Sequence, residues 1–253
     1  MSKSSRPLTR ISIELVPRDE NSLKQDLKHL KEAFHGVNTV NIPDLAHFSM
    51  RSWQGCAMAK DYFPSAIPHI RAMDLKRDEP LPMVEYLRKH GIKEVLVVTG
   101  DKPAGELPPD HATAVDIIRK FKEEMPEVNV YAAIDQYRNG FQTECEYVQR
   151  KRDAGASGFF TQPFFDLRLM EIYAEMFAGI DLFFGVSPVI SDRSVAYWRN
   201  NNKVIFPKGF IPSLGWNRDF TSQALSFARK MRINIYIMPI RVDIKNYLTG
   251  IIS

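Results

Sequence analysis

Short apolar runs rich in β-branched residues alternate along the chain with longer stretches in which apolar residues recur every three or four positions. The run EVLVVT at 94–99 is almost wholly apolar, which is typical of a strand covered on both faces. The stretch 22–34 carries a single apolar stripe at helical spacing, with Ser22 as the predicted N-cap and Gly36 as the stop. This stripe consists of Leu23, Leu27, Leu30 and Phe34.

The same alternation continues to the end of the sequence. The apolar runs predict strands at 11–16, 39–42, 66–72, 94–99, 129–134, 158–162, 181–186 and 234–238. The amphipathic stretches predict helices near 22–34, 52–62, 81–90, 113–124, 143–154, 167–177, 192–200, 220–232 and 242–251. Strands that each precede a helix, repeated eight times in about 250 residues, predict an α/β fold of the closed (β/α)8 TIM barrel type.

An open, doubly wound sheet is the competing architecture, but no GxGxxG motif follows any predicted strand. No linker or shift in composition marks a second domain, so we expect residues 1–253 to form a single barrel domain. We expect residues 1–10 to be a flexible N-terminal segment. The longest irregular stretch, 202–217, is a candidate loop over the site.

Composition and charge narrow the functional classes. Apolar residues make up 44% of the chain and charged residues 25%, which are ordinary globular values. The formal net charge is only +4, and the cations are spread evenly, so we expect no nucleic acid as partner. No apolar run approaches the roughly 20 residues that span a bilayer, so we expect no membrane association.

The start of the chain lacks the apolar core of a secretory signal. Cys56 and Cys145 belong to no CxxC or HExxH motif, so we expect free thiols in a reducing compartment, by default the cytoplasm. Two cysteines are too few for a cysteine-only zinc site, and no metal is expected.

Polar residues within or just after the apolar runs are the candidates for chemistry, because barrel enzymes place their sites at the carboxyl ends of the strands. Glu14 interrupts the first strand; a buried carboxylate there has a raised pKa and suits a general acid, whereas the alternative is a surface glutamate. His69 and Arg71 share one face of the third strand and either point inward at the mouth or form a satisfied core pair. Asp101 follows Gly100 at the end of the fourth strand, as a site residue or a loop cap.

Three more candidates lie in the second half. The amide of Gln162, at the tip of the sixth strand, suits the hydrogen-bonding edge of a heterocycle. The planar guanidinium of Arg241 suits a ligand carboxylate, with a salt bridge across the barrel top as the alternative. Trp198, on the helix after the seventh strand, is either a ligand contact or ordinary packing. The neighbours of Gln162 are either core or a stacking platform; they are Phe159, Phe160, Phe164 and Phe165.

Taken in order, these residues resemble a known family. A glutamate in the first strand, PHI in the third, TGD after the fourth, DAGA before TQPFFD at the sixth and GVSPV in the seventh are similar to the catalytic domain of 5,10-methylenetetrahydrofolate reductases. The resemblance covers residues 11–251, and RDAGASGFFTQPFFD at 152–166 is its most specific part. It implies a (β/α)8 barrel that reduces 5,10-methylenetetrahydrofolate to 5-methyltetrahydrofolate, in the service of methionine biosynthesis and one-carbon metabolism. Most members use FAD, which takes a hydride from NADH or NADPH.

The resemblance also implies roles. Glu14 matches the acid that helps to open the five-membered ring, and Asp101 matches the carboxylate near the flavin and the pterin. The implied substrate-binding residues are Gln162, Trp198 and Arg241. The implied cofactor-binding residues are Asn41, His69, Thr99, Gly100, Asp101, Ala133 and Lys151, of which Lys151 matches a phosphate-side contact.

The flavin half of the site departs from the family pattern. Ile134 stands where a tyrosine is expected, Gln136 and Arg138 replace an acid and a histidine, and Asn41 replaces a threonine. A flavin-free member with direct hydride transfer from NADH is therefore an alternative. A non-catalytic folate-binding partner subunit is another, although such a protein has no need of a ring-opening acid. Partners are expected to be folate and a nicotinamide nucleotide, with a homo-oligomer or a partner subunit left open.

Overall fold

The computed structural model describes residues 9–45, 47–100 and 110–252. Within these residues, parallel strands pair in sequence order from β1 to β8, and β8 pairs with β1 to close a barrel. The strands are β1 Ile11–Glu14, β2 Thr39–Ile42, β3 Ser65–Arg71, β4 Glu94–Val98, β5 Asn129–Ile134, β6 Gly158–Pro163, β7 Asp181–Val186 and β8 Asn234–Ile237. The predicted (β/α)8 barrel is confirmed.

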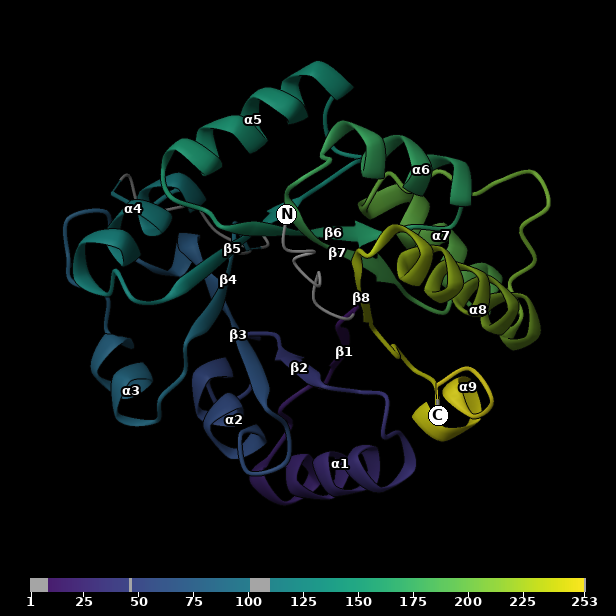
Figure 1. Ribbon diagram of the computed structural model, residues 1–253, viewed down its shortest axis with the longest axis horizontal. Coiled ribbons are helices and arrows are strands. Elements are labelled where there is room, and N and C mark those ends of the chain that lie inside the picture. Colours follow the sequence, from purple (N-terminus) through teal and green to yellow (C-terminus); the bar gives the residue numbers. More distant parts are fainter. Residues whose placement is uncertain (1–8, 46, 101–109, 253) are drawn as a thin grey trace, which may run out of the picture.

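Helices surround the strands on the outside, as Figure 1 shows. They are α1 Glu20–Ala33, α2 Ser52–Ala59, the 3₁₀ turn η1 Ala72–Asp74, α3 Val84–Lys89, α4 Ala114–Glu124, α5 Phe141–Asp153, α6 Leu167–Met176, α7 Asp192–Asn201, α8 Leu214–Met231 and α9 Ile244–Leu248. The last helix has only five residues. No helix in the described part of the chain is long and apolar enough to cross a membrane.

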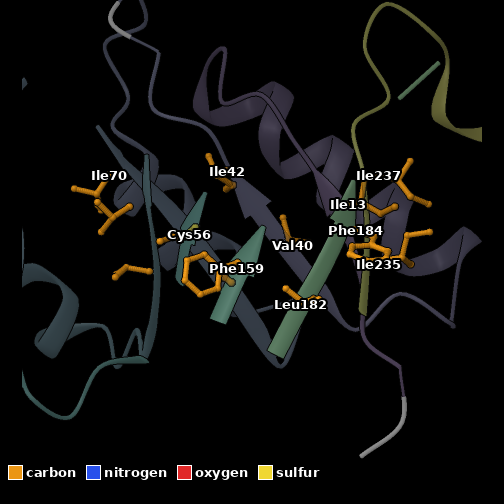
Figure 2. Packing of buried hydrophobic residues seen from close by; sticks show 14 of the residues in the cluster. Ile13, Val40, Ile42, Cys56, Ile70, Phe159, Leu182, Phe184, Ile235 and Ile237 are labelled. Carbon is orange, nitrogen blue, oxygen red and sulfur yellow. The ribbon is translucent and has the colours of Figure 1, made fainter. Parts of the chain in front are cut away.

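Two apolar layers hold the barrel together. The outer layer fills the space between strands and helices, and Figure 2 shows Ile13, Val40, Phe184 and Ile235 packed within it. The inner layer fills the barrel itself. It consists of Ile67, Leu96, Tyr131, Phe160, Phe183, Tyr236 and Met238. A filled interior leaves ligands only the rim at the carboxyl ends of the strands.

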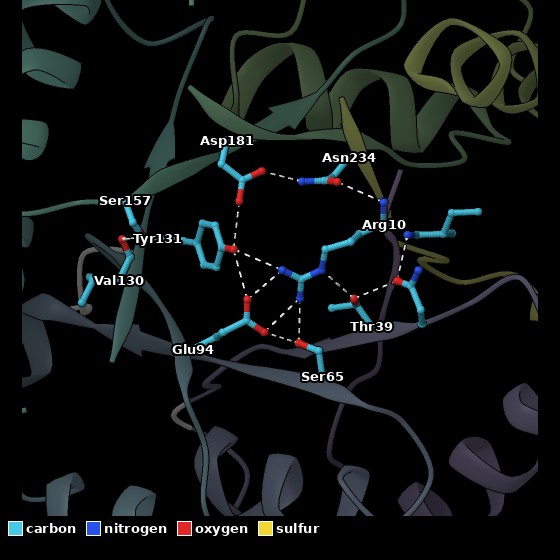
Figure 3. A network of polar contacts seen from close by, with 11 residues as sticks. Arg10, Thr39, Ser65, Glu94, Val130, Tyr131, Ser157, Asp181 and Asn234 are labelled. Atoms are coloured by element: carbon cyan, nitrogen blue, oxygen red, sulfur yellow. Dashed lines mark hydrogen bonds and ion pairs between the residues drawn. The ribbon is translucent and has the colours of Figure 1, made fainter. Parts of the chain in front are cut away.

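A polar network closes the amino end of the barrel (Figure 3). The Arg10 guanidinium donates to both carboxylate oxygens of Glu94, at 2.7 and 2.9 Å, and to the Ser65 hydroxyl at 2.7 Å. It also donates to the Tyr131 hydroxyl at 3.1 Å and to the Thr39 hydroxyl at 3.2 Å. Arg10, which the sequence analysis placed in a flexible N-terminal segment, is therefore anchored to four different strands.

Several element boundaries differ from the predictions, and the starts of α1 and α8 have an identifiable cause. The N-cap of α1 is Asp19 instead of Ser22, because the Asp19 carboxylate accepts the backbone N–H of Ser22 at 2.9 Å. The predicted helix 220–232 begins at Leu214, where the Ser213 hydroxyl accepts from the backbone N–H of Trp216. The predicted irregular stretch 202–217 is shortened accordingly.

Candidate active site

The site begins at the carboxyl end of β1, where Glu14 enters the barrel interior. The Asn41 side-chain amide, on the adjacent strand β2, donates to Glu14 Oε2 at 3.0 Å and lies 3.1 Å from His69 Nε2 on β3. Glu14 Oε2 and His69 Nε2 are 3.9 Å apart. Ser12 lies two residues before Glu14 on the same face of β1, and its hydroxyl donates to Asn41 Oδ1 at 2.7 Å. Three of the predicted site residues thus form one hydrogen-bonded cluster.

Burial sets the protonation states in this cluster. It raises the pKa of Glu14 to about 7, against the opposing effect of the Asn41 hydrogen bond. It lowers the pKa of His69 to about 3, so this imidazole is neutral at physiological pH. The Glu14 side chain is only 14% exposed, which excludes the surface-glutamate alternative. The raised pKa predicted from the sequence is confirmed, and it suits a group that both gives and takes a proton near neutral pH.

A cavity of about 340 Å³ opens at the carboxyl ends of β2 to β6; His69 is the member of the cluster that lines it, and Glu14 is not among the lining residues. Arg71 lines it, and so do several predicted ligand-binding residues: His69, Thr99, Gly100, Ala133, Lys151 and Gln162. Gly100 has a φ of +94°, and a Cβ there would lie 2.9 Å from Met73 Cγ, so the chain turns sharply and closely at this rim. Asp101, the predicted second carboxylate, lies outside the described residues.

Lys151 approaches this cavity from α5 and is almost fully buried. Its amine donates to the Ala133 carbonyl at 2.5 Å and lies 3.7 Å from the centre of the Tyr147 ring. Burial lowers its pKa to about 8, although nearby Glu144 acts in the opposite direction. The Glu144 carboxylate is itself buried and accepts the backbone N–H of Asp135 at 3.0 Å. Lys151 is thus a cation at neutral pH with donors left for an anionic ligand.

Gln162 lies at an irregularity in the β6–β7 pairing, and such bulges re-aim side chains near active sites. The Gln136 amide holds the backbone there: its Nε2 donates to the Gln162 carbonyl at 2.8 Å, and its Oε1 accepts the Gln162 N–H at 3.0 Å. The Thr161 hydroxyl accepts from Gly185 N–H at 3.0 Å, and the Tyr236 hydroxyl donates to the Thr161 carbonyl. These contacts fix the strand tip that presents the Gln162 side chain to the cavity.

Trp198 and Arg241 line a separate cavity of about 300 Å³ beside α7. Trp198 is 8% exposed and packs edge-on against Phe165, so it serves as core and as cavity wall. Arg241 adopts a left-handed backbone with φ of 58° just after β8. The structure therefore does not bring these two residues into the cavity that Gln162 lines.

The remaining candidates are accounted for by packing. Phe159, Phe160, Phe164 and Phe165 are buried core residues. Ile134 packs in the outer apolar layer, away from the cavity. Cys56 and Cys145 are free thiols, as predicted. The described residues contain no group of three or more histidine, cysteine or carboxylate side chains placed to hold a metal ion.

Two contributors to the site carry no signal of their own in the sequence. Ser12 looks like an ordinary strand residue, and its role depends on the β1–β2 register that sets Ser12 opposite Thr39 and Glu14 opposite Asn41. Gln136 attracted notice only as a departure from the family pattern, yet it holds the β6 tip. The strand periodicity of two places Ser12 on the same face as Glu14, and this shared face is the one indication of its role in the sequence.

Solved structures share the barrel at low sequence identity. A 2,3-dimethylmalate lyase, described as a PEP mutase/isocitrate lyase superfamily member, superposes with a TM-score of 0.59 at 13% identity, over 97% of this chain and 76% of that chain. An oxaloacetate acetylhydrolase superposes with a TM-score of 0.58 at 13% identity, over 91% of this chain and 75% of that one. At such identities these likenesses concern the fold alone.

Sequence comparison is more specific. The chain is 28% identical to the 5,10-methylenetetrahydrofolate reductase of Salmonella typhimurium and 27% identical to that of Escherichia coli, in each case over 149 residues. The match covers 56% of this chain and 50% of either relative, so the chain spans about half the length of the relatives that it matches. The methylenetetrahydrofolate reductase family model matches residues 46–222, well over half of the chain. The chain belongs to the methylenetetrahydrofolate reductase family.

Proposed function

We propose that this protein reduces 5,10-methylenetetrahydrofolate to 5-methyltetrahydrofolate, with NADH or NADPH as the hydride donor. The observation that carries the proposal is Glu14, a buried carboxyl with a pKa of about 7 at the carboxyl end of β1, in a chain of this family. Opening the five-membered ring of the substrate requires protonation of a ring nitrogen. A carboxyl that is half protonated near pH 7 is matched to that task.

Each remaining residue has a binding role in this proposal. The Gln162 amide offers one acceptor and two donors, which suits the amide edge of a pterin. Neutral His69 beside Glu14 adds no positive charge to the site, which favours the cationic iminium that ring opening produces. Asp101 would stabilise the same cation. Trp198 and Arg241, which line the separate cavity beside α7, would contact the aromatic and carboxylate parts of a folate that extends from the pterin into that cavity.

The residues around the first cavity fit a flavin in part. Ala133 presents a small side chain to the cavity, and Arg138 and Lys151 supply cations for a diphosphate. The volume of about 340 Å³ is at the small end of ligand pockets, about 300–1,000 Å³, so a dinucleotide would extend across the open rim. We propose that His69, Thr99, Gly100, Ala133 and Lys151 hold FAD. When bound, FAD would carry the hydride from the nicotinamide to the folate.

One set of contacts favours the flavin-free alternative. Ile134 is packed away from the cavity, and both polar atoms of the Gln136 amide are used by the Gln162 backbone. Two positions where the family pattern has flavin-side groups therefore offer no contact here. Direct hydride transfer from NADH would use the same acid, Glu14, and the same pterin contact, Gln162.

The test combines one substitution with one spectrum. Glu14→Gln keeps the shape of the side chain but removes the transferable proton, so kcat should fall by about 10²-fold or more. The exposed variant Glu171→Gln on α6, which lines none of these cavities, is the matched control and should retain wild-type turnover. Full activity of Glu14→Gln would refute the catalytic role and favour a folate-binding protein without its own chemistry.

The spectrum decides how the hydride travels. FAD is added to the purified protein, followed by NADH and then by 5,10-methylenetetrahydrofolate. Flavin absorbance that NADH bleaches and the folate restores supports transfer through FAD. NADH-dependent turnover by a protein that binds no flavin would support direct transfer and remove FAD from the proposal.

A further inference from the structure

The Asn41 side chain is fully buried, and both of its amide hydrogens are used within the cluster at the barrel top. Its Oδ1 accepts from the Ser12 hydroxyl at 2.7 Å, and its Nδ2 lies 3.0 Å from Glu14 Oε2 and 3.1 Å from His69 Nε2. These contacts come from three adjacent strands, β1, β2 and β3. An asparagine with both amide hydrogens committed has no donor left for a ligand.

The ionised form of Glu14 selects which way the amide points. A carboxylate can only accept, so the amide nitrogen of Asn41 faces Glu14 and His69, and Oδ1 takes the hydrogen of the Ser12 hydroxyl. One hydrogen of Nδ2 is then directed at the carboxyl and the other at the imidazole. The amide is shared between the acid and the ring beside it.

This sharing determines where the protons of both neighbours lie. His69 Nε2 accepts a hydrogen bond, so the neutral ring carries its hydrogen on Nδ1. Glu14 Oε2 accepts from the same amide, so the proton of the neutral carboxyl lies on Oε1. Although His69 Nε2 is 3.9 Å from Glu14 Oε2, the amide hydrogen occupies its lone pair and keeps it from accepting the proton of the acid.

We propose that Asn41 is a positioning residue for the acid: it directs the transferable proton of Glu14 to Oε1 and prevents His69 from capturing it. The inference rests on the proposed function, in which Glu14 protonates the folate. The positioning role proposed for Asn41 replaces the cofactor-binding role that the family resemblance implies for this residue. A threonine, the residue expected here, has a single O–H hydrogen and can donate to only one of the two neighbours. Double donation is therefore specific to the asparagine of this chain.

Other titratable groups also face Glu14 and contribute to any pH profile. His69 approaches it from β3, and the Tyr236 hydroxyl on β8 is coupled to it electrostatically. A cavity of about 540 Å³ on the α1 and α9 side also reaches Glu14. Its charged lining residues are Arg18, Asp26, His29, Glu32, Asp243 and Lys245. Because a kinetic profile sums these groups, the experiment must follow the Glu14 carboxyl itself.

The carboxyl carbon of Glu14 is followed by NMR in protein labelled with ¹³C-glutamate, with Glu14→Gln to assign its signal. The Asn41 hydrogen bond stabilises the carboxylate, so its removal in Asn41→Leu should raise the pKa of Glu14 by about one to two pH units. Asn41→Thr should give a smaller rise. Ser12→Ala keeps the asparagine but removes the hydrogen bond that holds its amide, so it should also raise the pKa of Glu14. This variant provides the test if Asn41→Leu does not fold.

Kinetics on the same variants separate positioning from binding. For Asn41→Leu we expect kcat to fall about tenfold, since the proton is no longer directed at the substrate, with little change in KM for the folate. An unchanged Glu14 pKa in both Asn41→Leu and Ser12→Ala would overturn the proposal. Weaker flavin binding by Asn41→Leu would in that case indicate that Asn41 binds the cofactor instead. If Glu14→Gln retained turnover, the proposed function would fail while the titration still tested the hydrogen bond.

Discussion

Arg10 is the residue at which the amino end of the barrel is most sensitive to substitution. Arg10→Met keeps the length of the aliphatic stem but removes the charge and the guanidinium hydrogen bonds to Glu94, Ser65, Tyr131 and Thr39. Ser65 and Tyr131 still donate to the Glu94 carboxylate, but no cation remains beside it. The variant therefore leaves a mostly buried negative charge without a counterion.

The magnitude follows from the burial of the pair. Removing one partner of a buried ion pair costs about 3–5 kcal/mol. The Arg10 and Glu94 side chains are 24% and 16% exposed, so water screens part of the interaction and we expect the lower end, about 3 kcal/mol. For a domain of this size that corresponds to a fall in Tm of roughly 6–12 °C.

The loss should also depend on pH. Burial raises the pKa of Glu94, but the Arg10 guanidinium and the hydrogen bonds from Ser65 and Tyr131 outweigh it, so that pKa lies below its usual value. A lowered pKa gives stability that is fully present above the ordinary glutamate pKa of 4.5 and is lost as the pH falls through the lowered pKa. In Arg10→Met the carboxyl protonates more easily. The stability difference between the two proteins should therefore shrink on acidification.

Urea unfolding followed by circular dichroism at pH 7 and near pH 4 measures both effects. Arg10→Met combined with Glu94→Gln should recover about 1–3 kcal/mol, because no unpaired charge remains. Arg88→Met is the matched control: Arg88 pairs with Glu127 at 2.9 Å, but both side chains are about half exposed, and its urea midpoint should stay close to wild type. Equal losses in Arg10→Met and Arg88→Met, or a loss that does not change with pH, would refute the reasoning.

Two further predictions concern packing and the cavity. A Cβ at Gly158 would lie 2.5 Å from the Asp181 carbonyl oxygen, so Gly158→Ala should lower the free energy of unfolding in urea by about 1–3 kcal/mol. At Gly215 in α8 a Cβ would meet no atom within 4 Å, so Gly215→Ala should leave the free energy of unfolding unchanged or raise it by up to about 1 kcal/mol. Lys151→Met removes a buried cation beside the cavity, so flavin affinity measured by fluorescence titration should fall about tenfold, with exposed Lys89→Met as control; unchanged affinity would contradict the proposed phosphate contact.

The strand pattern was the most predictable feature of the sequence. Runs such as 94–99 are apolar on both faces because helices cover the barrel, and local periodicity captures that property. Asp19 and Ser22 show where local signals are ambiguous: both are good capping residues, and only the geometry selects the aspartate, which accepts from the Ser22 backbone. Gly215, two residues into α8, obscures the true start of that helix, since glycine is a weak helix former.

The candidate site was predictable only strand by strand. Glu14 and His69 could be placed at strand ends, but their contact through Asn41 depends on the pairing register of β1 with β2 and of β2 with β3. Trp198 and Arg241 carry suitable chemistry, yet their cavity is separate from that of Gln162, and no periodicity encodes that separation. Arg10 directly precedes the first apolar run, but strand periodicity carries no information about its partners on β2 to β5.

The closure of the barrel has a consequence for synthesis of the chain. The backbone N–H of Arg10 donates to Asn234 Oδ1 at 3.0 Å across 224 positions of sequence, and β1 pairs with β8 directly beside this contact. At about 5–20 residues per second, β1 is synthesised about 10 to 45 seconds before its last partner is made. Throughout that interval β1 presents an unpaired edge, the kind of surface through which strands associate between chains. Nascent chains that stop short of residue 234 should therefore be the aggregation-prone species of this protein.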